Sequence, residues 1–198
     1  MPRQSILAFT LAAVATMLVA VPSSAAKLSV GDHAPDWSNL PGIDDQTHGL
    51  ADYKDAKLVV VAFICNHCPV SRAYEERLVA LQEKYKSKDV QFIGVAVNAR
   101  DDDRLPAMKV RAAEKKYNFP YLYDESQQIA RDYGATVTPH VFVLDGDRKV
   151  AYFGAVDDNQ NPDRATKHYL ADALEALIAG NKPDPATTKE FGCGLVWK

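Results

Sequence analysis

The chain has 198 residues, with a hydrophobic fraction of 47%, a charged fraction of 25% and a formal net charge of -3 at pH 7. This composition is typical of a globular protein and excludes a disordered chain. The 26 acidic residues outnumber the 23 Lys and Arg residues, so there is no basic surplus to bind a nucleic-acid backbone. The three cysteines are too few for a disulfide-built miniprotein, and their odd number leaves one sulfur without an internal partner.

Residues 1–26 have the pattern of a secretory signal peptide. Residues 6–21 carry no charge and would span about 24 Å as a helix, which is short of a hydrocarbon core of about 30 Å. Pro22 ends this run, and Ser24-Ala25-Ala26 places small residues where a signal peptidase cuts. We predict cleavage, a periplasmic or secreted protein without stable membrane insertion, and a compartment where disulfides persist. An uncleaved N-terminal anchor is the alternative.

Two cysteines lie between a predicted strand and a predicted helix. Residues 57–64 are a continuous apolar, β-branched run, which predicts a strand covered on both faces, as in a parallel sheet. The sequence Cys65-Asn66-His67-Cys68-Pro69 follows directly. Over residues 70–85, apolar side chains recur at helical spacing, which predicts an amphipathic helix of about four turns.

The rest of the chain continues to alternate strands and helices, without an internal repeat. The predicted elements are a strand over 90–97, a helix over 105–117, a strand over 121–123, a helix over 126–133, two strands over 140–144 and 149–153 joined by a hairpin, and a helix over 169–178. Residues 101–103 are three aspartates, which we predict to form a solvated turn. The pattern predicts one α/β domain over residues 27–180 and a tail over residues 181–198.

Cys65 and Cys68 are close enough in sequence to form a small disulfide ring at the predicted helix start. The N-terminus of a helix stabilises a thiolate through its free N–H groups and its dipole, and a protonated His67 would add to this effect. We therefore predict a lowered pKa for Cys65, which would attack a substrate. Cys68, predicted to be more deeply buried, would resolve the resulting mixed disulfide.

Other uses of this motif are less compatible with the residues present. A structural zinc site needs four ligands, whereas the chain has one cysteine pair and dispersed histidines. Covalent haem attachment requires His directly after the second cysteine, where Pro69 stands. A purely structural disulfide between such close residues would constrain little of the chain. We predict no cofactor and no bound metal, and we keep a copper- or zinc-binding module as an alternative function.

The chain resembles the thioredoxin superfamily, in the redoxin branch that contains TlpA- and ResA-like oxidoreductases and the peroxiredoxins. The resemblance is carried by residues 30–37, by the Cys-x-x-Cys motif and by residues 134–139. It implies a thioredoxin-like α/β fold, with a central mixed sheet flanked by helices and a redoxin-type N-terminal extension and insertion. It also implies that Thr138-Pro139 is a cis bond, which costs only about 0.5–1 kcal/mol, with a trans proline as the alternative. In the family this proline faces the disulfide and helps to hold the substrate chain by backbone pairing.

The resemblance implies an exported enzyme that exchanges dithiol and disulfide with the cysteines of other exported proteins. Cys65 and Cys68 would be catalytic, with His67, Thr138 and Pro139 in supporting roles. A membrane-embedded electron donor or acceptor is an implied partner. His67 stands where strongly oxidising relatives have His, but their neighbouring Pro is absent, which leaves the direction of electron flow open.

Two departures from the relatives affect the chemistry. If Cys68 is placed at the peroxide-attacking position of peroxiredoxins, Val61 and Cys65 stand where those relatives have Pro and Thr. The hydrogen-bond donors that polarise peroxide are then absent, so a thiol peroxidase is the alternative function and not the first one. Val59 stands where many reducing relatives carry an acidic proton carrier, so another group must move protons in this chain.

Cys193 lies between two glycines near the C-terminus, in a segment whose apolar residues could dock onto the domain. Two interpretations are open. Cys193 reaches the active site as a third redox cysteine and forms a disulfide with Cys65 or Cys68, or it is a thiol without a catalytic role.

Overall fold

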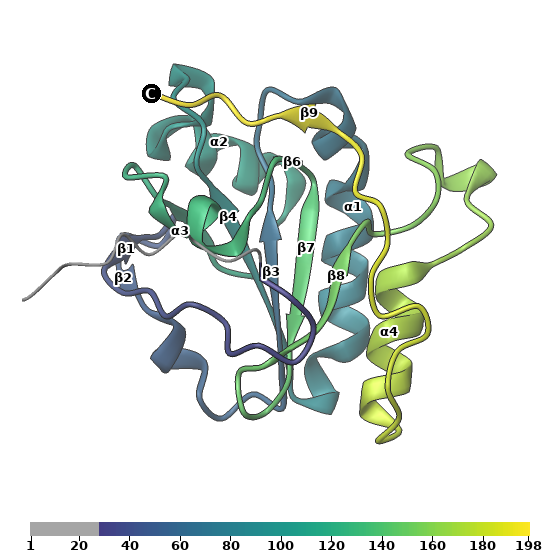
Figure 1. The fold of residues 1–198 in the computed structure, drawn as a ribbon. Coiled ribbons are helices and arrows are strands. Elements are labelled where there is room, and N and C mark those ends of the chain that lie inside the picture. The colour runs from purple at the N-terminus through teal and green to yellow at the C-terminus, as the bar shows by residue number, and fades with distance from the viewer. Residues whose placement is uncertain (1–27) are drawn as a thin grey trace, which may run out of the picture.

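The computed structural model describes residues 28–198, so the predicted signal peptide lies outside the described residues. Its centre is a five-stranded sheet with the strand order β5-β4-β3-β7-β8 (Figure 1). These strands are β3 (Leu58–Phe63), β4 (Val90–Ala96), β5 (Tyr121–Tyr123), β7 (His140–Leu144) and β8 (Val150–Gly154). Strands β3, β4 and β5 run parallel, whereas β7 is antiparallel to both of its neighbours, so the predicted mixed sheet is confirmed.

Helices and short strands surround this sheet in the described part of the chain. The α-helices are α1 (Pro69–Tyr85), α2 (Leu105–Lys115), α3 (Gln128–Tyr133) and α4 (Tyr169–Ile178). The short strands form two pairs, β1 (Leu40–Pro41) with β2 (Thr47–His48), and β6 (Val137–Thr138) with β9 (Cys193–Gly194). The 3-10 helices are η1 (Leu50–Tyr53), η2 (Lys86–Lys88), η3 (Asp101–Asp103) and η4 (Pro162–Arg164). Within residues 28–198, no helix has the length and apolar character needed to cross a membrane.

The elements predicted from periodicity are confirmed to within about three residues at each end. Helix α2 ends before the predicted residue 117 because Lys116 takes a left-handed conformation, with a φ of 54°. Helix α3 ends at Tyr133, as predicted, and Gly134 follows it with a φ of 69°, which favours glycine. The two-residue strands were not predicted, because so short a segment has no measurable periodicity.

Alternate residues of the central strands face opposite sides of the sheet and bury two apolar layers. All six residues of β3 are buried, which confirms a strand covered on both faces. On one face, Val60 and Ala62 pack with residues of α1, α2 and α4. On the other face, Val61 and Phe63 pack with α3 and with the N-terminal segment that contains β1 and β2. Figure 1 shows α3, β1 and β2 on the side of the sheet opposite α1 and α4. Because β3 and β4 are parallel, the loops that follow them emerge at the same edge of the sheet.

A buried ion pair holds α2 against α1 next to this edge. Arg111 of α2 donates from Nε and Nη2 to the two carboxylate oxygens of Glu75 in α1, at 2.8 and 2.7 Å. The Glu75 side chain is only 2% exposed, so its charge depends on this partner. The contact fixes the position of α2, which directly follows η3 in the chain.

We expect Arg111→Ala to lower the free energy of unfolding by about 3–5 kcal/mol, because Glu75 would remain as an uncompensated buried charge. The matched control is Lys84→Ala, which breaks an ion pair with Glu175 whose side chains are 55% and 45% exposed. Such a surface pair contributes about 0–1 kcal/mol. Urea unfolding curves measure both losses, and equal losses would contradict this account of the α1–α2 contact.

Candidate active site

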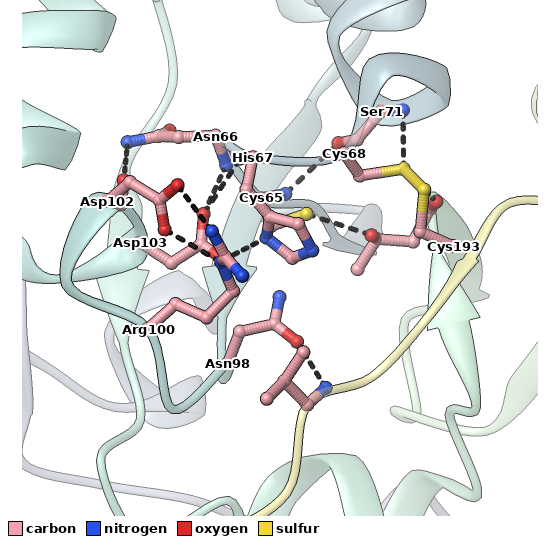
Figure 2. A network of polar contacts seen from close by, with 12 residues as sticks. Cys65, Asn66, His67, Cys68, Ser71, Asn98, Arg100, Asp102, Asp103 and Cys193 are labelled. Carbon is pink, nitrogen blue, oxygen red and sulfur yellow. Dashed lines mark hydrogen bonds and ion pairs between the residues drawn. A yellow bond between two sulfur atoms is a disulfide. The ribbon is translucent and has the colours of Figure 1, made fainter.

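The Cys-x-x-Cys motif lies between the end of β3 and the start of α1 (Figure 2). Cys68 is the N-cap of α1, and its sulfur accepts a hydrogen bond from the Ser71 backbone N–H at 3.4 Å. Cys65 lies in the preceding loop, where its own N–H donates to Ser71 Oγ at 3.0 Å. Cys68 is therefore the N-cap of the helix, while the backbone N–H groups of His67 and Cys68 act on Cys65 and lower the pKa of its thiol.

Cys68 forms a disulfide with Cys193, with the two Cα atoms 5.9 Å apart, and Cys65 is a free thiol. This pairing corresponds to the first of the two interpretations of Cys193, in which the tail reaches the cysteine motif. It differs from the predicted small ring between Cys65 and Cys68. The partner comes from 125 residues away in the sequence, and the tail brings it to the helix start.

The loop before β7 completes the surroundings of both sulfurs. The Thr138-Pro139 bond is cis, as the resemblance implied. The Thr138 hydroxyl oxygen lies 2.9 Å from the Cys65 sulfur, within hydrogen-bond distance, and the Thr138 carbonyl oxygen lies 3.3 Å from the Cys68 sulfur. One buried residue thus contacts both cysteines of the motif, through its side chain and its backbone.

Cys65 is 3% exposed, and this burial raises the pKa of its thiol to about 11. The hydrogen bond with Thr138 lowers the pKa of Cys65, while the negative charge of Asp103 raises it further. The predicted lowering of this pKa is wrong in direction, because a buried thiolate loses more hydration than the surrounding hydrogen bonds return. In this redox form Cys65 is a protonated thiol at neutral pH.

Asp103 is a site residue that was not predicted from the sequence. The predicted solvated turn is correct for Asp101, whose side chain is fully exposed, but wrong for Asp103, whose side chain is 0% exposed. Its Oδ1 accepts the backbone N–H groups of Asn66 at 2.7 Å and of His67 at 3.0 Å, and its Oδ2 accepts from Nδ1 of His67. Three adjacent aspartates carry no signal of which one turns inward, and only the fold brings η3 beneath the cysteine motif.

The Asp103 carboxylate fixes the loop between the two cysteines. Its hydrogen bonds to two backbone N–H groups and to the His67 ring compensate the burial of the charge and hold the ring in one orientation. The His67 side chain is 16% exposed and therefore remains accessible to water. Ligand-type atoms of Cys65, His67 and Asp103 all lie within 4.8 Å of one another. Figure 2 shows these three side chains grouped at the cysteine motif.

Cys65, His67 and Asp103 are also the one group of candidate metal ligands within residues 28–198. They offer three ligand atoms, one short of the four protein ligands of a structural zinc site. A metal ion would also have to replace the ion pair between His67 and Asp103. The observed hydrogen bonds therefore explain this cluster without a metal.

The redoxin family model matches residues 29–172 of the chain. The chain belongs to the redoxin family. This redoxin has a thioredoxin-like fold and is an oxidoreductase that works through cysteine thiols. No curated protein sequence matches it significantly.

Solved structures support the same fold. An uncharacterized conserved protein of Geobacillus kaustophilus is 34% identical, with a TM-score of 0.81 over 86% of this chain and 93% of that chain. A hypothetical protein of Sinorhizobium meliloti is 29% identical, with a TM-score of 0.81 over 87% of this chain and 97% of that chain. A protein of Chlorobium tepidum, provisionally assigned as the thiol:disulfide interchange protein DsbE, is 28% identical, with a TM-score of 0.61 over 78% and 98%.

We expect alkylation of Cys65 by iodoacetamide in the oxidised protein to rise about tenfold for each pH unit between pH 7 and 10, because only the thiolate reacts. The raised pKa of about 11 keeps the thiol protonated throughout this range. Mass spectrometry of labelled Cys65 gives the rates. In the urea-unfolded control with its disulfide intact, the rate should level off near the ordinary thiol pKa of about 8.5. A plateau below pH 9 in the folded protein would contradict the raised pKa.

Proposed function

We propose that this redoxin is an exported thiol-disulfide oxidoreductase that exchanges dithiol and disulfide with protein substrates through its Cys-x-x-Cys motif. The observation that carries the proposal is the position of Cys68, whose sulfur caps α1, lies beside Thr138 and is bonded to Cys193. A free thiol at Cys65 contacts the same threonine, so three sulfurs converge on one loop. The name of the Chlorobium tepidum relative supports the substrate class.

Cys68 is the attacking sulfur in the proposed cycle. When its disulfide is reduced, the Ser71 N–H and the positive end of α1 stabilise the Cys68 thiolate. This exchanges the roles expected from the sequence, in which Cys65 attacked and Cys68 resolved. Cys65 lies outside the helix and is a protonated thiol at neutral pH, so it serves as a second resolving thiol.

The proposed cycle takes its electrons from an external dithiol. The donor reduces the Cys68–Cys193 disulfide to two thiols and is itself oxidised to a disulfide. The Cys68 thiolate then attacks a substrate disulfide, forms a mixed disulfide and releases one substrate thiolate, which takes up a proton. Cys193 or Cys65 attacks the Cys68 sulfur and releases the second substrate thiolate. The same steps in reverse oxidise a substrate dithiol.

His67 is placed to carry the proton of Cys65 during these steps. Its ring lies within 4.8 Å of the Cys65 sulfur and is partly accessible to solvent. Asp103 acts as a positioning residue, because its carboxylate holds the ring through Nδ1 and leaves Nε2 to exchange protons. This pair replaces the acidic residue that many reducing relatives carry where Val59 stands here.

The proposal also includes export and the redox partners of the protein. The signal-like pattern of residues 1–26 supports export, where the substrates would be the cysteines of other exported proteins. A membrane-embedded partner would supply or accept the electrons. The reduction potential of the cysteines sets the direction, because a value of about -120 mV makes an oxidant and one of about -270 mV makes a reductant.

We expect Cys68→Ser to lower insulin reduction on the order of a hundredfold, because Cys68 forms the mixed disulfide in the proposed cycle. Cys65→Ser should lose about tenfold, since one of two resolving thiols remains. Turbidity of reduced insulin, with a dithiol donor, measures the rates. The control is Ser87→Ala, an exposed residue outside the site. Activity of Cys68→Ser at the wild-type rate would overturn the proposal.

Peroxide is the second candidate substrate, and the pairing of a helix-capping cysteine with a distant resolving cysteine favours it. The Cys68 thiolate would attack hydrogen peroxide to give a sulfenic acid and hydroxide, which takes up a proton to form water. The Cys193 thiol would then condense with the sulfenic acid to a disulfide and a second water. We expect slow reaction, within about tenfold of a simple peptide thiol, because Val61 and Cys65 replace the residues that polarise peroxide. Peroxide consumption with a dithiol donor measures this rate, and a much faster rate would favour a peroxidase.

A further inference from the structure

The end of the tail adds a strand to the edge of the cis-proline loop. Strand β9 pairs antiparallel with β6, with Cys193 opposite Thr138 and Gly194 opposite Val137. The Leu195 N–H continues this ladder by donating to the Thr136 carbonyl at 3.0 Å. Figure 1 shows β9 beside β6, above the central sheet. A segment from the far end of the chain is therefore bound here as an extended peptide, and the disulfide joins it to Cys68.

Two buried side chains hold the next residues of the tail by their backbone groups. Asn98 Oδ1 accepts the Val196 N–H at 2.7 Å, a contact that Figure 2 shows. Gln127 donates from Nε2 to the Val196 carbonyl at 2.9 Å, and its Oε1 accepts the Lys198 N–H at 2.9 Å. Asn98 and Gln127 are 0% and 1% exposed. Because they contact only main-chain atoms of the tail, they would hold another extended chain equally well.

The surface nevertheless restricts which residue can precede the cysteine. A Cβ atom on Gly192 would lie 2.0 Å from the Thr138 carbonyl oxygen, so only glycine fits there. A Cβ atom on Gly194 would meet nothing within 4 Å, so that position is open. Leu195, two residues after the cysteine, is buried in the core layer that contains α3. A segment bound here therefore has glycine directly before its cysteine, any residue directly after it and an apolar residue at the next position.

We propose that the tail is an internal substrate. The site formed by β6, Asn98 and Gln127 binds extended protein segments with the pattern Gly-Cys-x-apolar, and residues 192–195 occupy it in the disulfide form. This inference rests on the proposed function, because it takes Cys68 as the sulfur that forms the mixed disulfide.

The tail leaves the site and returns to it in each catalytic turnover. An external dithiol reduces the Cys68–Cys193 disulfide to two thiols, and the tail leaves the site. A substrate segment then pairs with β6, and the Cys68 thiolate attacks its disulfide and releases one substrate thiolate. The Cys193 thiolate attacks the Cys68 sulfur, releases the second substrate thiolate and restores the disulfide. Because both segments need the same edge, the substrate segment leaves β6 while it is still joined to Cys68, and the tail takes its place as Cys193 attacks.

The first test uses a peptide with the sequence of residues 189–198, whose cysteine carries a 2-nitro-5-thiobenzoate leaving group. It is mixed with the reduced full chain, and the release of the coloured thiolate is measured. Replacing the glycine before the cysteine with alanine should slow the reaction about tenfold or more, because the added methyl group meets the Thr138 carbonyl. The matched control replaces the glycine after the cysteine with alanine, and its rate should stay within about twofold. Equal rates for all three peptides would overturn the inference.

The second test makes the same changes in the full chain. In glutathione buffers, Gly192→Ala should shift the Cys68–Cys193 equilibrium toward the thiols about tenfold, and Gly194→Ala should not. Amide hydrogen exchange then reports the release of the tail. The Leu195 and Val196 amides should be protected in the oxidised protein and exchange rapidly after reduction. Protection that persists after reduction would overturn the release of the tail.

The outcomes separate this inference from the proposed function. If Cys68→Ser abolishes insulin reduction but the peptides react equally, the tail inference fails and the oxidoreductase proposal stands. If the glycine peptide is preferred but protein disulfides are not reduced, the binding site stands and the proposed function fails. A dimer linked between Cys68 of one copy and Cys193 of another would also overturn the internal arrangement.

Discussion

The disulfide between Cys68 and Cys193 lies where three parts of the fold meet, and the geometry of the site depends on this bond. One end of the bond is the N-cap of α1, which the parallel strand β3 leads into. The other end is a strand that pairs with the loop before Pro139. The strand-to-helix junction, the cis-proline loop and the C-terminal tail are therefore held together by one covalent bond and a short backbone ladder.

The same junction gives the two motif cysteines different environments. Cys68 receives a backbone N–H and the end of the helix dipole, both of which favour a negative sulfur. Cys65 is buried next to a hydroxyl and near the charge of Asp103, and the loss of hydration raises the pKa of its thiol. The two cysteines are three positions apart and both are buried, but only Cys68 is the N-cap of the helix, and the N–H groups of His67 and Cys68 do not offset the effect of burial on Cys65.

The tail contacts explain how a backbone-directed site can still be selective. Main-chain hydrogen bonds to β6, Asn98 and Gln127 do not depend on the side chains of the bound segment. Selectivity comes from exclusion, because the Thr138 carbonyl leaves no room for a side chain at Gly192. A free backbone edge next to a reactive sulfur would accept many partners. Because the tail occupies this edge in the disulfide form, other segments can bind to it only when the protein is reduced.

Sequence alone determined the central strands and helices, the strand-to-helix position of the cysteine motif and, through resemblance, the cis bond before Pro139. These features follow from local patterns, because periodicity and turn residues act over a few positions. The tertiary structure decided which sulfurs pair, which cysteine caps the helix and which aspartate turns inward. A pairing across 125 residues and a pKa set by burial depend on distances through space. The spacing of residues along the chain does not specify those distances, and the packing of the sheet, helices and tail does.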